Sequence, residues 1–366
     1  MSAGLYLHFP FCKKRCDYCD FVSTTDLDQR KGYLSLLIKE KHLYQKDWDR
    51  EIFDTIYFGG GTPSLLPPED WEKLAEWVAK ELPGLSEFTI EANPESVTRQ
   101  FISSVEKTGC TRISLGIQST DDHVLSCIGR IHTAKQANEA AVLVKNSRIQ
   151  QVNFDFIVGL PGETREGIET NCQFIETYRP QHISLYFLSL SSSTILFQTQ
   201  KTNPSLFPDE KRMVEWWKHY IRFFDQLGYQ HYEISNFSLP GYESQHNNHY
   251  WERDPYLGLG VNASSYLPEK RWTNEPQLKS YRQKLLLAEK PVHQSEILSQ
   301  ESIRFEKIML GLRKLKTGIP VDIVDQNKHN LLQELLDKQW LKLQNTRLIL
   351  TENGCLWLDA IIRKLA

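Results

Sequence analysis

Three cysteines crowd one short segment near the start of the sequence, Cys12-Lys13-Lys14-Arg15-Cys16-Asp17-Tyr18-Cys19. Cys thiolates at such tight spacing hold iron–sulfur clusters. Asp20-Phe21 follows without a fourth cysteine nearby, so a 4Fe-4S cluster on Cys12, Cys16 and Cys19 would keep one iron without a protein ligand. An open position on a metal is typical of a site that binds a reacting molecule.

A zinc site made of the same three cysteines and His8 is the alternative. Zinc sites usually pair two knuckles that are separated by a dozen or more residues, and no second knuckle is present, so we favour the cluster. The other cysteines are scattered over the chain, at Cys110, Cys127, Cys172 and Cys355. This pattern predicts a reduced compartment, the cytoplasm, rather than a disulfide framework.

A glycine run, Gly59-Gly60-Gly61-Thr62-Pro63, follows a strand-like segment downstream of the cysteines. Glycines let the backbone approach a ligand without a Cβ in the way. A glycine run alone is more often a plain turn, but its place after a strand favours a ligand site. Asp155 also stands out, because a carboxylate in an apolar strand is costly to bury without partners. Gln118 and Arg130 are two further polar candidates for this site, although they could also be a solvated polar pair without a ligand.

The elements that position these residues are six strand-like runs, each followed by a helix-like stretch. They predict a mostly parallel sheet whose carboxyl ends build one site. Six units are too few to close a barrel, so the predicted fold is α/β, an open partial (β/α)6 barrel. The runs are Leu5 to Phe9, Thr55 to Phe58, Phe88 to Glu91, Ile113 to Ile117, Val152 to Ile157 and Ile183 to Leu188.

The alternation of strands and helices stops after Tyr266. We predict a core domain over residues 1–268, a charged linker over 269–294, and a small α+β domain over 295–366. In the last part, the runs 340–343 and 347–350 flank Gln344-Asn345-Thr346 as a hairpin between helices, which is the pattern of a winged-helix-like module.

The net charge of -3 and the sequence pI of about 6.4 provide no general field for phosphate backbones or anionic lipid. We therefore expect no nucleic-acid partner, and at most peripheral contact with a membrane. No apolar run reaches the ~20 residues of a membrane span, and the first residues do not form a signal peptide.

The cysteine spacing after the first strand resembles the radical-SAM superfamily, whose members bind S-adenosylmethionine at such a cluster. Within it the chain is similar to the oxygen-independent coproporphyrinogen III oxidase group, and in particular to its HemW-type heme chaperone branch. The stretches that carry the resemblance are Tyr6 to Cys12, Ile90 to Pro94, Ser114 to Ser119, Gly129 to His132, Asp155 to Gly162, His231 to Phe237 and His246 to Trp251.

The resemblance implies roles for particular residues. Tyr6, Gly60 and Glu91 match contacts to a first S-adenosylmethionine, and Glu91 is suited to accept hydrogen bonds from ribose hydroxyls. The positions that match a second S-adenosylmethionine in the oxidases are Tyr18, Gly61, Thr62, Gln118, Arg130, Asp155 and Ser189. One departure is Ser191-Ser192-Ser193, where the family often has an acidic residue. It puts in doubt any proton transfer assigned to that acid.

The segment His246-Asn247-Asn248-His249-Tyr250-Trp251 is a mark of the chaperone branch. We expect His246 to ligate heme iron, with Tyr250 and Trp251 as an aromatic wall near the barrel mouth. The alternative to heme ligation is a structural role for His246 in a hydrogen-bonding turn. His249 is a second candidate ligand for heme iron. Phe21 also favours the chaperone branch, because the oxidases have a fourth cysteine at this position. The oxidases carry an N-terminal arm as well, and we expect the few residues before Cys12 to leave no room for it.

We therefore expect a heme chaperone with a 4Fe-4S cluster and S-adenosylmethionine. Its expected partners are heme, an unidentified acceptor protein and an electron donor. Reductive cleavage of S-adenosylmethionine is compatible with this site, whereas coproporphyrinogen III oxidase, the alternative function, is not expected. Radical modification of tRNA, a third hypothesis, lacks the basic stripe that RNA binding needs.

Overall fold

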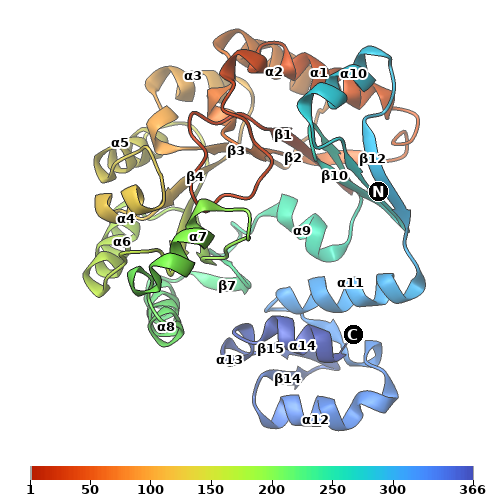
Figure 1. The fold of residues 1–366 in the computed structure, drawn as a ribbon. Helices are drawn as coiled ribbons and strands as arrows, with labels where there is room; N and C mark the ends of the chain where they lie inside the picture. Colours follow the sequence, from red (N-terminus) through yellow and green to blue (C-terminus); the bar gives the residue numbers. More distant parts are fainter. Residues whose placement is uncertain (1, 366) are drawn as a thin grey trace.

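A computed structural model describes residues 2–365 of the chain. Six parallel strands run in sequence order at its centre, and their positions confirm the six predicted runs. They are β1 (Ser2–Phe9), β2 (Ile52–Gly60), β3 (Glu87–Ala92), β4 (Arg112–Gln118), β5 (Gln151–Val158) and β6 (His182–Phe187). With the helices between them, these strands form the predicted α/β partial barrel (Figure 1).

Helices cover the outer face of the curved sheet (Figure 1). They are α1 (Tyr33–Leu43), α2 (Pro68–Glu81), α3 (Arg99–Lys107), α4 (Asp122–Cys127), α5 (Ala134–Lys145), α6 (Arg165–Tyr178) and α8 (Glu210–Gln226). Helix α7 (Ile195–Thr202) lies instead beside the cysteine loop, where the Leu196 N–H donates to the Asp17 carbonyl. Side-chain caps begin several of them: Thr98, Thr133 and Thr164 accept a backbone N–H at the starts of α3, α5 and α6. Asp209 does the same for α8, whose apolar face packs into the core.

The sheet continues beyond the six strands on both sides and reaches twelve strands in the order β12-β11-β10-β9-β1-β2-β3-β4-β5-β6-β8-β7. Antiparallel additions end each side, so the barrel is not closed. The added strands are β7 (Gln230–Glu233), β8 (Asn236–Ser238), β9 (Tyr256–Leu259), β10 (Ser264–Leu267), β11 (Lys270–Asn274) and β12 (Val292–Ile297).

The predicted linker over 269–294 needs correction, because most of it is ordered secondary structure. It contains β11, helix α10 (Leu278–Leu286) and the start of β12. Trp272, Tyr281 and Leu285 are buried in the main core, and the Tyr281 hydroxyl donates to buried Glu40 at 2.6 Å. The charged residues between them are half-buried or exposed, and their number made the segment resemble a polar linker.

The C-terminal part forms a second, smaller core. Its main helices are α11 (Gln300–Arg313), α12 (His329–Asp337) and α14 (Leu358–Leu365), and its antiparallel sheet has the order β13-β15-β14. β13 spans Ile319–Pro320, and β14 (Leu341–Gln344) pairs with β15 (Arg347–Leu350) as the predicted hairpin. No helix among residues 2–365 has the length and apolar character that crossing a membrane requires.

Candidate functional site

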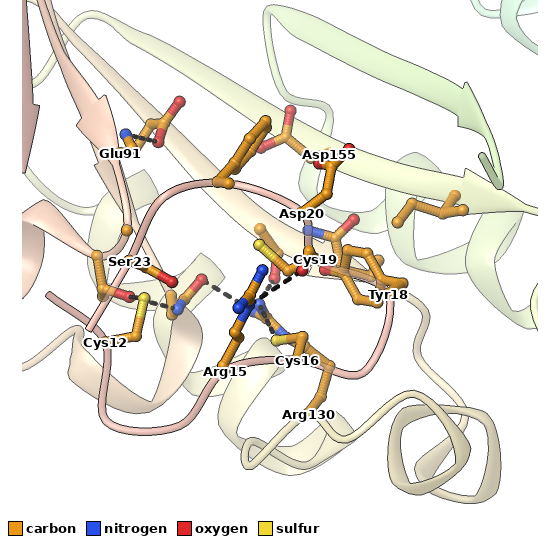
Figure 2. Close-up of a pocket in the computed structure, with 18 of the residues that line it drawn as sticks. Cys12, Arg15, Cys16, Tyr18, Cys19, Asp20, Ser23, Glu91, Arg130 and Asp155 are labelled. Atoms are coloured by element: carbon orange, nitrogen blue, oxygen red, sulfur yellow. Dashed lines mark hydrogen bonds between the residues drawn. The ribbon is translucent and has the colours of Figure 1, made fainter. Parts of the chain in front are cut away.

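A cavity of about 390 Å³ lies where β1 to β6 end, and all three clustered cysteines line it (Figure 2). Nine of the ten residues predicted to contact S-adenosylmethionine line the same cavity. They are Tyr18, Gly60, Gly61, Thr62, Glu91, Gln118, Arg130, Asp155 and Ser189. The strand ends therefore bring together residues that are far apart in sequence.

The cysteine loop is held against the barrel by backbone hydrogen bonds. The Cys12 N–H donates to the Thr24 carbonyl at 3.0 Å, and the Asp17 N–H donates to the Ile128 carbonyl at 3.0 Å. All three thiols are free, and burial raises the pKa of Cys12 and Cys19. Three thiols on one cavity wall fit a 4Fe-4S cluster, which would hold them as thiolates.

His8 does not complete a zinc site with these thiols. Its Nδ1 pairs with the Tyr6 hydroxyl at 2.9 Å and its Nε2 with the Val22 carbonyl at 3.0 Å, so both ring nitrogens are engaged. Of the described residues that line the cavity, none is a histidine. The three thiols therefore have no histidine beside them at the cavity, which favours the cluster over a zinc site of three cysteines and His8.

The glycine run packs directly against the cysteine loop. The Gly61 N–H donates to the Phe9 carbonyl at 2.8 Å, and the Thr62 N–H donates to the Phe11 carbonyl at 2.9 Å. A Cβ at Gly61 would lie 2.8 Å from both carbonyl oxygens, so only glycine fits there. The Thr62 hydroxyl in turn donates to the Cys12 Sγ at 3.6 Å.

Glu91 places its carboxylate at the cavity wall from the end of β3. The Tyr57 hydroxyl donates to Oε1 at 2.7 Å, and the Gly60 N–H donates to Oε2 at 3.0 Å. Burial raises the pKa of Glu91 to about 7, although the bond from Tyr57 lowers it. Glu91 is therefore about half ionised near neutral pH, and its ionised form can accept hydrogen bonds from a ligand.

Arg130 joins the cysteine loop to the strand ends, and is not half of a solvated pair. Its guanidinium donates to the Cys16 Sγ at 3.7 Å, the Asn93 Oδ1 at 2.9 Å and the Gly116 carbonyl at 2.6 Å. Gln118 lies beside it with a φ of 65°, a left-handed conformation that is uncommon for a residue with a side chain. Such local strain is often found at binding sites.

Asp155 has the partners that its buried position demands. The Ser114 hydroxyl donates to Oδ2 at 3.0 Å and the Asn153 amide donates to Oδ1 at 2.8 Å. Burial raises the pKa of Asp155, and these bonds lower it. Its carboxylate faces the cavity from β5 (Figure 2). Tyr6 alone of the ten residues lies beneath the wall, where its hydroxyl meets His8.

The residues predicted to bind heme lie elsewhere. His246, Tyr250 and Trp251 belong to helix α9 (Gln245–Glu252), and none is among the described residues that line the cavity. We expected this segment near the barrel mouth, but it packs against β1 and β2 beneath the cavity. His246 is 0% exposed, and both ring nitrogens have partners. Ligation of iron by His246 stays a prediction that would require one of these two bonds to break and the buried ring to become accessible.

Sequence reasoning missed some wall residues. Tyr57 supports Glu91, but it reads as an ordinary aromatic of an apolar strand. Asn93 bridges Thr62 and Arg130; its place with Glu91 at the end of the third predicted strand marks it as a polar residue of the site, but not its bridging role. Nothing in the sequence marked Phe187 as a residue of the cavity wall.

Comparison with known proteins agrees with this fold. Residues 6–175 match the family model of the Radical SAM superfamily, the class that the partial barrel and three-cysteine loop define. The structure of coproporphyrinogen III oxidase (HemN) from Escherichia coli superposes with a TM-score of 0.84 at 19% identity, covering 100% of this chain and 89% of that one. At 19% identity, this similarity shows that the two proteins share a fold, and it carries no conclusion about activity.

More similar relatives identify the family within the Radical SAM superfamily. The heme chaperone HemW of Lactococcus lactis is 34% identical over 348 residues, which are 94% of this chain and 90% of that protein. HemW of Mycobacterium tuberculosis is 32% identical over 368 residues, covering 99% and 94%. The chain therefore belongs to the HemW family of radical SAM proteins.

Proposed function

We propose that this protein is a heme chaperone, which binds heme and transfers it to an acceptor protein. The family relationship supports this function, since the relatives that match almost the whole chain are heme chaperones by name. The observation that carries it in this chain is an apolar rim around the cavity mouth. We further propose the cytoplasm as its location, because all seven cysteines are free.

The rim consists of large hydrophobic side chains that remain in contact with solvent. Phe21 is 61% exposed, Tyr186 41% and Phe187 37%, and all three line the cavity. Ile195, 64% exposed, begins helix α7, whose Leu196 N–H donates to the Asp17 carbonyl in the cysteine loop. Contiguous exposed apolar side chains mark binding sites. A flat, apolar macrocycle such as heme matches this surface.

Cations stand beside this rim. Lys14 and Arg15 lie on the exposed part of the cysteine loop and also line the cavity. Heme carries anionic propionates, and an arginine or lysine next to an apolar surface can pair with them. The combination of apolar rim and cations supports an amphipathic, anionic ligand of the heme type.

The deeper wall is proposed to hold the other cofactors. Cys12, Cys16 and Cys19 would ligate the cluster, and Glu91 would accept hydrogen bonds from S-adenosylmethionine. When bound, the cluster supplies an electron for reductive cleavage of S-adenosylmethionine, and an electron donor would have to provide it. Arg130 and Asn93 would keep the cysteine loop and the strand ends at a fixed separation, through the hydrogen bonds described above.

Substitution of the rim tests this function. We expect the double substitution Phe21→Ser and Phe187→Ser to weaken heme binding at least about tenfold. Burying one such aromatic side chain against bound heme would contribute roughly 1.5 to 3 kcal/mol. Phe305→Ser is the matched control, since Phe305 is 42% exposed but lies on α11 of the C-terminal part. Heme titration of the full chain measures both. Equal affinity in the rim variant and the control would contradict the rim as the heme site.

A further inference from the structure

Helix α9 fills the barrel beneath the cavity and packs on β1 and β2, between the sheet and α11 (Figure 1). Its fit against β1 is tight at Gly4. A Cβ at Gly4 would lie 3.1 Å from the His246 Cε1 and 3.4 Å from the His249 Cδ2. Two histidines of the His-Asn-Asn-His-Tyr-Trp segment therefore pack against the backbone of the first strand.

The His246 ring is fixed from two sides. Nδ1 hydrogen-bonds with the Thr55 hydroxyl at 2.9 Å, and Nε2 hydrogen-bonds with the Tyr250 hydroxyl at 2.8 Å. Burial lowers the pKa of His246 to about 3, so the imidazole is neutral. A neutral imidazole has one donor and one acceptor nitrogen, and each hydroxyl can take the complementary role. The ring orientation is therefore set by β2 and by α9 itself.

The fixed ring touches the support of Glu91. The ring centroids of His246 and Tyr57 are 5.3 Å apart, and the Tyr57 hydroxyl donates to the Glu91 carboxylate at 2.7 Å. Gly59 also packs closely on the Tyr57 ring, since a Cβ there would lie 2.8 Å from the Tyr57 Cε1. An unbroken chain of contacts thus runs from His246 through Tyr57 to a carboxylate of the cavity wall.

The start of α9 reaches the second cavity carboxylate by a separate route. The Ser244 N–H donates to the Tyr232 hydroxyl at 3.2 Å, and this hydroxyl meets the His182 Nε2 at 2.8 Å. His182 Nδ1 then meets the Asn153 Oδ1 at 2.6 Å, and Asn153 donates to Asp155. Both buried routes converge on α9, which supports a role for this helix in shaping the cavity wall.

We propose that His246 is a positioning residue for S-adenosylmethionine: it orients Tyr57, which holds the Glu91 carboxylate at the cavity wall. The inference rests on the proposed S-adenosylmethionine site and gives the His-Asn-Asn-His-Tyr-Trp segment a role other than iron ligation. Residues that orient a ligand-binding group through hydrogen bonds and packing commonly change affinity by 10- to 100-fold when replaced.

A double-mutant cycle on the full chain with reconstituted cluster tests the proposal. The probe is S-adenosylmethionine itself, titrated against the EPR signal of the reduced cluster. We expect His246→Leu and Tyr57→Phe each to raise Kd about tenfold, and the double variant also about tenfold, because both act on the same bond to Glu91. The matched control is His231→Leu, since His231 is stacked on Phe237 and bonds to the Ile234 carbonyl. Its Kd should stay within about twofold, because His231 does not line the cavity.

Several results would overturn the inference. A double variant weakened about a hundredfold would show independent effects, and an unchanged Kd in His246→Leu would show no effect on the site. Loss of heme binding in His246→Leu with an unchanged Kd for S-adenosylmethionine would instead identify an iron ligand. If the wild-type protein itself does not bind S-adenosylmethionine, the proposed site fails, and the inference fails with it.

A milder variant covers the case in which His246→Leu does not fold. Tyr250→Phe removes only the hydroxyl that bonds to the His246 Nε2. We expect it to raise the Kd for S-adenosylmethionine about fivefold, the equivalent of one hydrogen bond, with iron content unchanged. An unchanged Kd in this folded variant would contradict the proposal.

Discussion

Cys12, Cys16 and Cys19 share one cavity wall, so each should be needed for the same cluster. We expect anaerobically reconstituted protein to hold about four iron and four sulfide per chain, and S-adenosylmethionine to change the EPR signal of the reduced cluster. Replacing any one of the three by serine should abolish both properties. Cys110→Ser is the control, because Cys110 is buried in the core away from the cavity. Tightly bound zinc without sulfide would contradict the cluster.

Glu91 should make the binding of S-adenosylmethionine depend on pH. Its pKa is raised to about 7 by burial, so the carboxyl is mostly protonated at pH 6 and mostly ionised at pH 8. Since the ionised form accepts hydrogen bonds from the ligand, affinity should rise with pH across this window, by up to about tenfold per unit. Titrations at several pH values measure it.

Glu91→Gln is the control for this pH dependence, because the amide does not titrate. The variant should bind more weakly at pH 8 and lose the part of the dependence that Glu91 causes. An identical pH profile in the wild type and in Glu91→Gln would assign the titration to another group, such as the amino group of the ligand.

Single residues were predictable to very different degrees. The cysteine spacing and the glycine run carry their chemistry in local sequence, and both meet at the cavity. His246 shows the limit, since its neighbours Thr55 and Tyr57 come from a strand almost two hundred residues earlier. No local pattern reveals that both of its nitrogens are engaged by such partners.

At the scale of elements, the hairpin between β14 and β15 invites a stabilising substitution. Asn345 and Thr346 have φ values of 48° and 64°, as a two-residue type I′ turn requires. A β-branched residue is strained there, whereas glycine is not. We expect Thr346→Gly to stabilise the C-terminal part by about 0.5 to 1 kcal/mol, after the entropy cost of glycine in the unfolded chain.

Denaturant unfolding of the full chain measures this effect. Thr346→Ala is the control, because alanine removes the β-branch but keeps a Cβ at positive φ, and it should stabilise less than glycine. A Thr346→Gly variant less stable than the wild type would show that the Thr346 side chain contributes more than its backbone strain costs.

The hairpin could be predicted from the sequence, whereas β11 and α10, in the segment predicted as a linker, could not. The hairpin has short β-rich runs around a turn, a pattern that depends on neighbours in sequence. The strand β11 and helix α10 depend on tertiary contacts instead, such as Trp272 donating to the Tyr44 hydroxyl at 3.1 Å. In the sequence, charged residues surround the few apolar positions of β11 and α10 that enter the core, so no clear strand or helix pattern is visible.

At the scale of the whole molecule, the fold shared with the oxidase does not imply its reaction. We expect no conversion of coproporphyrinogen III, because Phe21 stands at the cavity where we expect the oxidases to have a fourth cysteine. Turnover can be measured with a competent reductant, beside a genuine oxidase as a positive control. Comparable rates would overturn the chaperone and favour the enzyme.

We propose that one chain holds the cluster, S-adenosylmethionine and heme, and transfers the heme to an acceptor protein. Heme titration of the anaerobically reconstituted full chain, followed by mixing with a heme-free acceptor, tests this function. We expect about one heme per chain, with the iron and sulfide of the cluster retained, and then transfer of the heme absorbance from this protein to the acceptor. Protein that holds its cluster and binds S-adenosylmethionine, but neither takes up heme nor passes it on, would contradict a chaperone function.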